Sequence, residues 1–370
     1  MPLRFALVGG GKISQTHIRA ATLSGRATLA AGCFSRDAAK NAAVAGQYSV
    51  PAERTYPDFE TMARAEAQRA DRPDFVVVTT PNASHFDACR AFMAQGFPVV
   101  CDKPLTTGAD KADELAALAS SLHLACMTSY TFLGAPGVRA LRALYDSGRF
   151  GKAFFLTLKY LRGARLNDVM GDPHSVWRFE PDLSGRAGAV GDLGSHLESL
   201  ARCVAGPLDS VLARLVREPN GIALDATASV LFTTAGGLDG SMQIGQLACG
   251  HENEVELELW CERGSLSWSF ASPDSVRVHH ADGRSESIAA GEWGSALADV
   301  PIDPDPYVTC FQRLYEAYFA ALDGAPADGR PWFPTFADGA AGVHFIDACV
   351  DSHEQGNRWV RVGSPADGGR

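Results

Sequence analysis

The sequence has little positive charge, and it lacks the long apolar runs and spaced cysteines that mark several classes of protein. Its 33 Lys and Arg residues are outnumbered by 43 Asp and Glu residues, which gives a formal net charge of −10. Nucleic-acid binding needs a basic face for phosphate contacts, so we expect no DNA or RNA partner. No apolar run approaches the roughly 18 residues that a membrane-spanning helix requires, so we expect no membrane partner.

The nine cysteines are scattered, without a C-x-x-C pair or a regular spacing. This distribution is typical of reduced thiols and argues against a disulfide framework or a zinc site, so we expect no bound metal. The first apolar stretch, residues 5–8, runs directly into a glycine loop. Because no signal peptide fits in front of this loop, we predict a cytoplasmic protein.

The chain of 370 residues is long enough for two domains of about 150 residues each. In residues 1–128, short apolar runs alternate with stretches of helical periodicity. Continuous apolar strands separated by helices predict an α/β fold with a doubly wound, parallel Rossmann sheet. The predicted strands are residues 3–8, 28–34, 75–79, 99–101 and 124–127.

In residues 129–362 the pattern changes, and strands with one polar face dominate. Residues 255–261 alternate strictly, with Trp260 on the face that carries the polar side chains. The pattern predicts an α+β domain with an open, largely antiparallel sheet. Because the face with Trp260 is partly apolar, we expect it to pair with a second copy in a homodimer or homotetramer. Residues 363–370 are small and polar, and we expect a frayed tail.

A glycine loop follows the first predicted strand. Residues 9–14 read G-G-G-K-I-S, which matches G-x-G-x-x-G except that Ser14 replaces the last glycine. Gly9 permits a tight turn, and Gly11 lets the backbone approach a pyrophosphate. Lys12 and Ile13 then begin a helix whose N-terminus favours negative charge. The strand–loop–helix context predicts a nucleotide cofactor site; a plain turn is the alternative.

The end of the second predicted strand bears on the choice of cofactor. NAD-binding folds usually place Asp or Glu there to hold the ribose 2′-hydroxyl. This chain has Ser35 and Arg36 instead, and a guanidinium can bind a 2′-phosphate through two hydrogen bonds. We therefore expect NADP in preference to NAD. The alternative is that Asp37 caps the next helix and Arg36 is solvated.

Polar residues also follow the third and fourth predicted strands. Residues at the carboxyl ends of parallel strands face the ligand crevice. We therefore assign six of them to the cofactor site: Thr80, Pro81, Asn82, His85, Asp102 and Lys103. Asn82 could instead cap the helix that follows, and Lys103 could be a solvated charge. Pro104 restricts the backbone behind Lys103, and a cis peptide is one form it could take.

Asp192 and His196 are four residues apart, so on a helix they share one face. A carboxylate near an imidazole orients the ring and raises its basicity, as an acid–base pair requires. A capping pair within one helix is the alternative. Residues 163–191, just before, show little periodicity, and a loop of this length is usually functional or disordered. It contains Trp177 and Arg178.

Together these motifs resemble the glucose–fructose oxidoreductase, inositol dehydrogenase and MocA (Gfo/Idh/MocA) family. The resemblance rests on residues 9–14, 80–85, 102–104 and 192–196, and it extends to residues 250–253, 264–266 and 338–339. It implies a Rossmann domain followed by a domain whose open sheet is used in oligomerisation. The implied activity is NAD(P)-dependent oxidation or reduction at a carbinol carbon of a sugar, anhydrosugar or cyclitol.

The resemblance also implies roles for single residues. The family's catalytic lysine, aspartate and histidine map onto Lys103, Asp192 and His196, which we expect to bind the substrate as well. Trp177 and Arg178 resemble a tryptophan–arginine element of sugar-oxidising members, and we assign them to the substrate. Two positions depart from the family: Asp102 replaces the usual Glu, and Ser35 replaces a frequent ribose-binding acid.

Two other functions on the same fold remain as alternatives. One is a redox-assisted glycoside hydrolase with tightly bound NAD, which would show no net turnover of the cofactor. The other is a non-catalytic NAD(P)-sensing regulator. The presence of Lys103, Asp192 and His196 argues against a regulator, because a sensor needs no acid–base pair.

Overall fold

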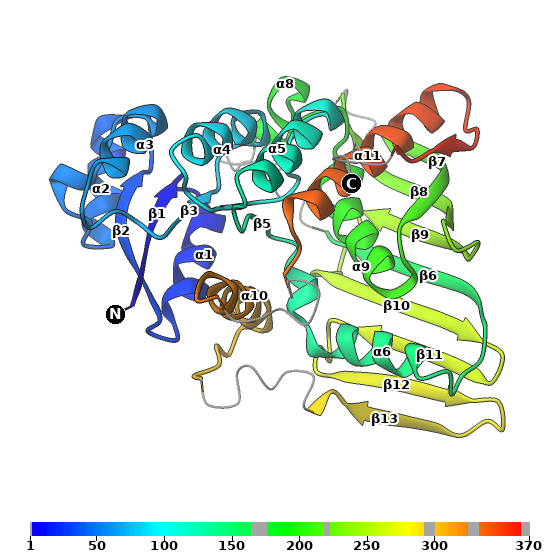
Figure 1. Cartoon of the computed structure of the whole chain (residues 1–370). Helices are drawn as coiled ribbons and strands as arrows, with labels where there is room; N and C mark the ends of the chain where they lie inside the picture. The colour runs from blue at the N-terminus through cyan, green and yellow to red at the C-terminus, as the bar shows by residue number, and fades with distance from the viewer. Residues whose placement is uncertain (1, 164–175, 218–222, 292–299, 325–332, 364–370) are drawn as a thin grey trace.

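The computed structural model describes residues 2–163, 176–217, 223–291, 300–324 and 333–363. These residues form two separate β-sheets with helices packed on them (Figure 1). None of the nine cysteines forms a disulfide, and most are buried, which confirms the expectation of free thiols. No helix among the described residues combines the length and apolar character needed to span a bilayer.

The first sheet has five strands in the order β2-β1-β3-β4-β5, and every pair is parallel, which confirms the predicted Rossmann sheet. The order reverses between β1 and β3, so the ligand crevice should open at the carboxyl ends of these two strands. The fifth strand is shorter than predicted and begins later. The strands are β1 (Leu3–Val8), β2 (Ala27–Cys33), β3 (Phe75–Val78), β4 (Val99–Cys101) and β5 (Met127–Thr128).

Helices cover both faces of the first sheet. Helices that follow its strands along the chain are α1 (Lys12–Thr22), α2 (Ala38–Gln47), α3 (Phe59–Ala67), α4 (His85–Met93) and α5 (Ala109–Ser121). One face packs against α3, α4 and α5. The other face packs against α1 and against α10 (Pro306–Leu322), although α10 lies in the range predicted for the second domain.

The second sheet has nine strands in the order β13-β12-β11-β10-β6-β9-β8-β7-β14. All pairs are antiparallel except β6 with β9, so the predicted largely antiparallel sheet is confirmed. The strands are β6 (Ala153–Leu161), β7 (Leu208–Arg217), β8 (Asp225–Thr234), β9 (Asp239–Gly245), β10 (Glu254–Cys261), β11 (Gly264–Ser269), β12 (Ser275–His280), β13 (Ser285–Ala289) and β14 (Val360–Arg361).

Three helices cover one face of this sheet: α6 (Pro136–Asp146), α9 (Ser195–Ala205) and α11 (Phe336–Glu354) (Figure 1). Two short elements precede α9 in the chain, α8 (Pro181–Ser184) and a single π-helical turn, η5 (Val190–Gly194). Helix α11 also packs against α5 and thereby joins the two sheets. The opposite face is open and forms a groove of about 1030 Å³ lined largely by serine and charged side chains.

The open face is less apolar than the sequence suggested. Trp260 is 44% exposed and stacks on Phe155, with 5.3 Å between the ring centroids. The middle of the face instead carries side chains such as Ser229, Ser241 and Ser267. Any contact across this face would therefore combine an aromatic edge with a polar centre.

Burial of α10 against the first sheet should contribute strongly to stability. Leu314 is fully buried there, so Leu314→Ala should lower the free energy of unfolding by about 2–5 kcal/mol through lost contacts and a cavity. Leu122→Ala removes the same atoms from a side chain that is 43% exposed and should cost no more than about 0.5 kcal/mol. Urea denaturation measures both. Equal small losses would show that α10 is not part of this core.

Candidate active site

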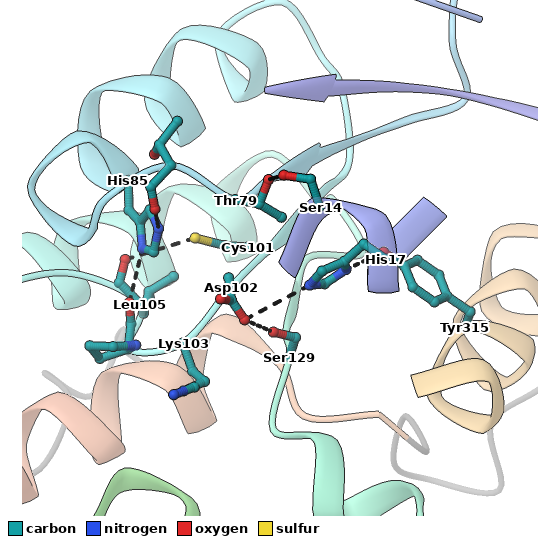
Figure 2. A network of polar contacts seen from close by, with 12 residues as sticks. Ser14, His17, Thr79, His85, Cys101, Asp102, Lys103, Leu105, Ser129 and Tyr315 are labelled. Carbon is teal, nitrogen blue, oxygen red and sulfur yellow. Dashed lines mark hydrogen bonds and ion pairs between the residues drawn. The ribbon is translucent and has the colours of Figure 1, made fainter. Parts of the chain in front are cut away.

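The glycine loop lies between β1 and α1 and packs against the end of β3. Gly9 has a φ of +114°, and a Cβ there would lie 2.6 Å from Thr79 Oγ1. Ser14, which replaces the third glycine, is buried, and its hydroxyl pairs with Thr79 Oγ1 at 2.8 Å (Figure 2). The serine thus ties α1 to the neighbouring strand end without blocking the loop.

The loop leaves room for an anionic group. A Cβ at Gly11 would meet no atom within 4 Å, and α1 begins with the exposed Lys12 and the half-buried Ile13. The N–H groups of a first turn have no partner within their helix and favour negative charge. The pyrophosphate of a dinucleotide fits this cradle.

The polar side chains that follow β2 differ in what they contact. Asp37 caps α2 by accepting a hydrogen bond from Lys40 N at 2.7 Å, as the capping alternative predicted. Ser35 Oγ accepts a hydrogen bond from Asp37 N at 3.1 Å. Arg36 is exposed beside them. The acid nearest the strand end therefore has a structural role, and the adjacent guanidinium is accessible.

The residues after β3 join loops and do not cap a helix. Asn82 Nδ2 donates to the carbonyl oxygen of Ser184 at 2.9 Å, which links this loop to α8. The His85 ring lies between the carbonyl oxygens of Thr80, at 2.9 Å, and Pro104, at 3.0 Å (Figure 2). Burial lowers the pKa of His85. Thr80 and Pro81 are part of the same half-buried loop.

Asp102 follows β4 and lies in a network that the sequence analysis did not find. Ser129 Oγ donates to Asp102 Oδ1 at 2.6 Å, and His17 Nε2 lies 3.8 Å from the same oxygen (Figure 2). The other ring nitrogen of His17 is 2.7 Å from the hydroxyl of Tyr315 on α10. Burial alone would raise the pKa of Asp102, but His17, Lys103 and Ser129 hold it well below its usual value.

Lys103 connects the two sheets. Its Nζ donates to Asp192 Oδ1 at 2.6 Å and to the Asp192 carbonyl oxygen at 2.9 Å. The Lys103 and Asp192 side chains are 12% and 23% exposed, so the pair is shielded but reachable. The Lys103–Pro104 peptide bond is cis, one of the two forms considered from the sequence.

Asp192 lies in the π turn η5, and its second carboxylate oxygen accepts a hydrogen bond from Gln246 Nε2 at 3.0 Å. Burial alone would raise the pKa of Asp192, but Lys103, Arg178 and Arg162 outweigh it and hold the pKa well below its usual value. The carboxylate is therefore ionised at neutral pH. Within the described part of the chain no hydrogen bond joins Asp192 to His196, although the charge of Asp192 acts on the ring.

His196 begins α9 and is 2% exposed. Its ring lies among three aromatic rings, with centroid distances of 5.0 Å to Phe132 and 6.0 Å to Tyr130 and to Tyr160. Burial, together with the charge of Lys103, lowers the pKa of His196 to about 3, although Asp192 acts in the opposite direction. The carboxylate therefore acts on the pKa of the ring in the predicted direction, but burial outweighs its effect.

The Trp177–Arg178 element lies within reach of Asp192. The Arg178 guanidinium is 4.8 Å from the centroid of the Trp177 ring, and its charge helps to lower the pKa of Asp192. Both side chains are half-buried. Residues 164–175 of the predicted functional loop lie outside the described residues.

Sequence reasoning missed Gln246, His17 and Ser129. A signal was present for Gln246, because it is a polar residue directly after the strand-forming residues of β9, and polar strand ends often line sites. None was present for His17, because a single histidine on a helix more often packs in the core. Its partners Asp102 and Tyr315 lie 85 and 298 residues away.

The site can hold a hydroxyl group and remove its proton. A lysine supplies a positive N–H donor, and a neutral imidazole supplies a proton acceptor. Lys103 follows β4, at the same edge of the sheet as the glycine loop, and its charge acts on His196. Such a constellation suits proton transfer beside a bound nucleotide.

Known proteins share both the sequence pattern and the fold. Residues 3–130 match the profile described as "Oxidoreductase family, NAD-binding Rossmann fold", and residues 138–267 match the GFO/IDH/MocA C-terminal domain. The levoglucosan dehydrogenase of Pseudarthrobacter phenanthrenivorans is 25% identical over 329 residues, which cover 79% of this chain and 81% of that protein.

Solved structures of an inositol dehydrogenase homologue from Azotobacter vinelandii superpose closely. Its complex with NAD+ has a TM-score of 0.91 at 26% identity, covering 98% of this chain and 97% of that one. Its complex with NADH and myo-inositol has a TM-score of 0.88 at 25% identity, covering 98% of each chain. The two matched profiles together span most of the chain, which therefore belongs to the GFO/IDH/MocA family of oxidoreductases.

Proposed function

We propose that this oxidoreductase transfers a hydride between a nicotinamide cofactor and a carbinol carbon of a cyclitol, sugar or anhydrosugar. The observation that carries the proposal is the contact of Lys103 with Asp192, with neutral His196 one turn further along the chain. The substrate class is supported by the relatives, of which one is named a levoglucosan dehydrogenase and another was solved with myo-inositol.

The three side chains divide the chemistry of oxidation between them. His196 takes the proton of the reacting hydroxyl, because its ring is neutral at pH 7. Lys103 donates a hydrogen bond to the same oxygen and stabilises the negative charge that develops there. Asp192 holds the Lys103 ammonium in place and can accept a second hydroxyl. A bound nicotinamide would supply the hydride acceptor for this oxidation.

The cofactor that we propose is NADP. Gly9, Gly11, Lys12 and Ile13 would surround the pyrophosphate, as the open cradle at Gly11 allows. Arg36 is accessible for a 2′-phosphate, and the neighbouring Asp37 is engaged as a helix cap. NAD remains the alternative, since the Azotobacter vinelandii homologue was solved with NAD+.

The architecture of the assembly is also a proposal. We place the boundary between the cofactor and substrate domains near residue 128, with α10 returning to the first sheet. The open face around Trp260 and Phe155 is the surface that we propose for a homodimer or homotetramer. A cytoplasmic location likewise stays a prediction.

A panel of polyols tests the reaction. Purified protein should reduce NADP or NAD in the presence of myo-inositol, levoglucosan or a monosaccharide, and absorbance of the reduced nicotinamide measures it. A hydrolase would release sugar products without net reduction, and a regulator would bind the nucleotide without turnover. Failure of every polyol to elicit reduction by a protein that binds the nucleotide would contradict the proposed function.

Removal of the proposed acid–base groups should slow chemistry and leave nucleotide binding almost unchanged. We expect His196→Ala to lower kcat by about 10²–10⁴-fold, the usual contribution of a positioned base. Lys103→Ala should raise the barrier by about 3 kcal/mol, as loss of an oxyanion donor does. Because both groups act on one oxygen, the double variant should lose less than the sum.

The control for these variants is nucleotide affinity, measured by titration of the reduced cofactor. His196→Ala should retain it, because the ring is placed on the substrate side. Strictly additive losses in the double variant would speak against a shared oxygen.

Arg36→Ala tests the choice of cofactor. Loss of one charge-assisted contact should weaken NADP binding by roughly 10–150-fold and spare NAD. Lys40→Ala removes the same charge from a neighbouring exposed position of α2 and should change both affinities little. If the unaltered protein binds NAD more tightly than NADP, the proposed 2′-phosphate site is wrong.

A further inference from the structure

A buried carboxylate on the second sheet holds the turn that carries Asp192. Asp225 begins β8 and is 3% exposed. Its Oδ1 accepts a hydrogen bond from Gly188 N at 2.6 Å, and its Oδ2 accepts one from Val190 N at 2.9 Å. Charge-assisted bonds to backbone N–H groups are stronger than neutral ones and hold the donor segment in one place.

The segment that Asp225 holds is the start of η5. Leading N–H groups of a helical segment lack partners within it, and a carboxylate there both satisfies them and interacts favourably with the helix dipole. A π turn departs from the regular helical hydrogen-bond pattern, and such turns are frequent at functional sites. Asp192 is the third residue of this turn, two residues after Val190. A shift of the anchored backbone would therefore move the carboxylate that meets Lys103.

A second anchor acts on the Asp192 side chain itself. Gln246 follows β9 and donates from Nε2 to Asp192 Oδ2 at 3.0 Å. Its own backbone N–H donates to the carbonyl oxygen of Ala226, the residue after Asp225. The two anchors thus come from adjacent strand ends. One holds the backbone of the turn, and the other holds the carboxylate.

The packing of Gly194 supports the same placement of the Asp192 turn. Gly194 ends the turn, and a Cβ there would lie 2.9 Å from Ile244 Cδ1 on β9. The close approach shows that the turn lies directly on the second sheet. Lys103 then reaches Asp192 from the opposite side, at the end of β4.

We propose that Asp225 is a positioning residue for the reaction, acting through the Asp192 turn and, with Gln246, setting where Asp192 meets Lys103. The proposal rests on the proposed function for its catalytic consequence. Its structural part, the anchoring of residues 188–196, stands independently of any substrate.

Asp225→Asn is the direct test. The amide keeps one acceptor oxygen but turns an NH₂ group toward a backbone N–H, so one of the two anchoring bonds is lost. Hydrogen–deuterium exchange, followed by mass spectrometry, should show faster exchange in peptides covering residues 188–196. Asp58→Asn is the matched control, because Asp58 caps α3, a helix of the first sheet, by accepting from Thr61 N. It should speed exchange at the start of α3 and leave residues 188–196 unchanged.

The catalytic part is tested by turnover of the polyol that the unaltered protein oxidises. Asp225→Asn should lower kcat by roughly 10- to 100-fold, as small misplacement of reacting groups does. The primary isotope effect with substrate deuterated at the reacting carbon should rise, because slower chemistry becomes more rate-limiting. Nucleotide affinity should stay within about twofold. A merely destabilised protein would lose active molecules without a change in the isotope effect.

If Asp225→Asn does not fold, Gln246→Met provides a second variant, because a methionine side chain is similar in size to glutamine. It should reproduce the fall in kcat and the larger isotope effect. Unchanged exchange in residues 188–196 of Asp225→Asn, or an unchanged isotope effect in both variants, would overturn the proposal. Absence of polyol oxidation by the unaltered protein would instead overturn the proposed function, and the exchange measurement would still decide the anchoring.

Discussion

The contact between Lys103 Nζ and Asp192, at 2.6 Å, is the interaction on which the site depends. Lys103 belongs to the end of a parallel strand, and Asp192 belongs to a turn that rests on the other sheet. A shielded ion pair of this kind contributes specificity of geometry more reliably than stability, and loss of either partner leaves an uncompensated charge. Helices α10 and α11 each contribute to the cores of both sheets and so join the two sheets that carry the pair.

Burial alone would raise the pKa of Asp192 in this pair, whereas it lowers the pKa of the nearby His196. Asp192 stays ionised because three nearby cations outweigh the effect of burial. His196 has no comparable set of anions, so burial among aromatic rings lowers its pKa and keeps the ring neutral. The same site thus keeps a charged carboxylate and a neutral base four residues apart. Environments that separate the pKa values of neighbouring groups are how active sites assign acid and base roles.

Much of the fold could be read from local patterns. The buried valine run of β3 and the alternation in β10 are properties of short segments, and both strands formed where they were predicted. Strand β6 was missed, because the adjacent pair Phe154 and Phe155 interrupts its alternation before Leu156. The placement of α10 on the first sheet could not be predicted, because its partners, such as Phe75, lie more than 200 residues earlier.

The candidate site, like the fold, could be predicted from the sequence only in part. Lys103, Asp192 and His196 could be proposed because each belongs to a short motif, and the structure brings Lys103 and Asp192 into contact. The pKa of His196 was misjudged, because the sequence shows its neighbour Asp192 but not the rings that bury it. The anchoring by Asp225 depends on a fold that brings residues 35 and 37 positions apart together.

The most direct test of this account is a crystal structure of the protein with a nicotinamide nucleotide and an oxidised polyol. The account predicts one substrate hydroxyl about 3 Å from both Lys103 Nζ and a ring nitrogen of His196, with the Asp192 contact retained. Separation of Lys103 and His196 by more than about 10 Å in that complex would contradict it, because one hydroxyl could not contact both groups.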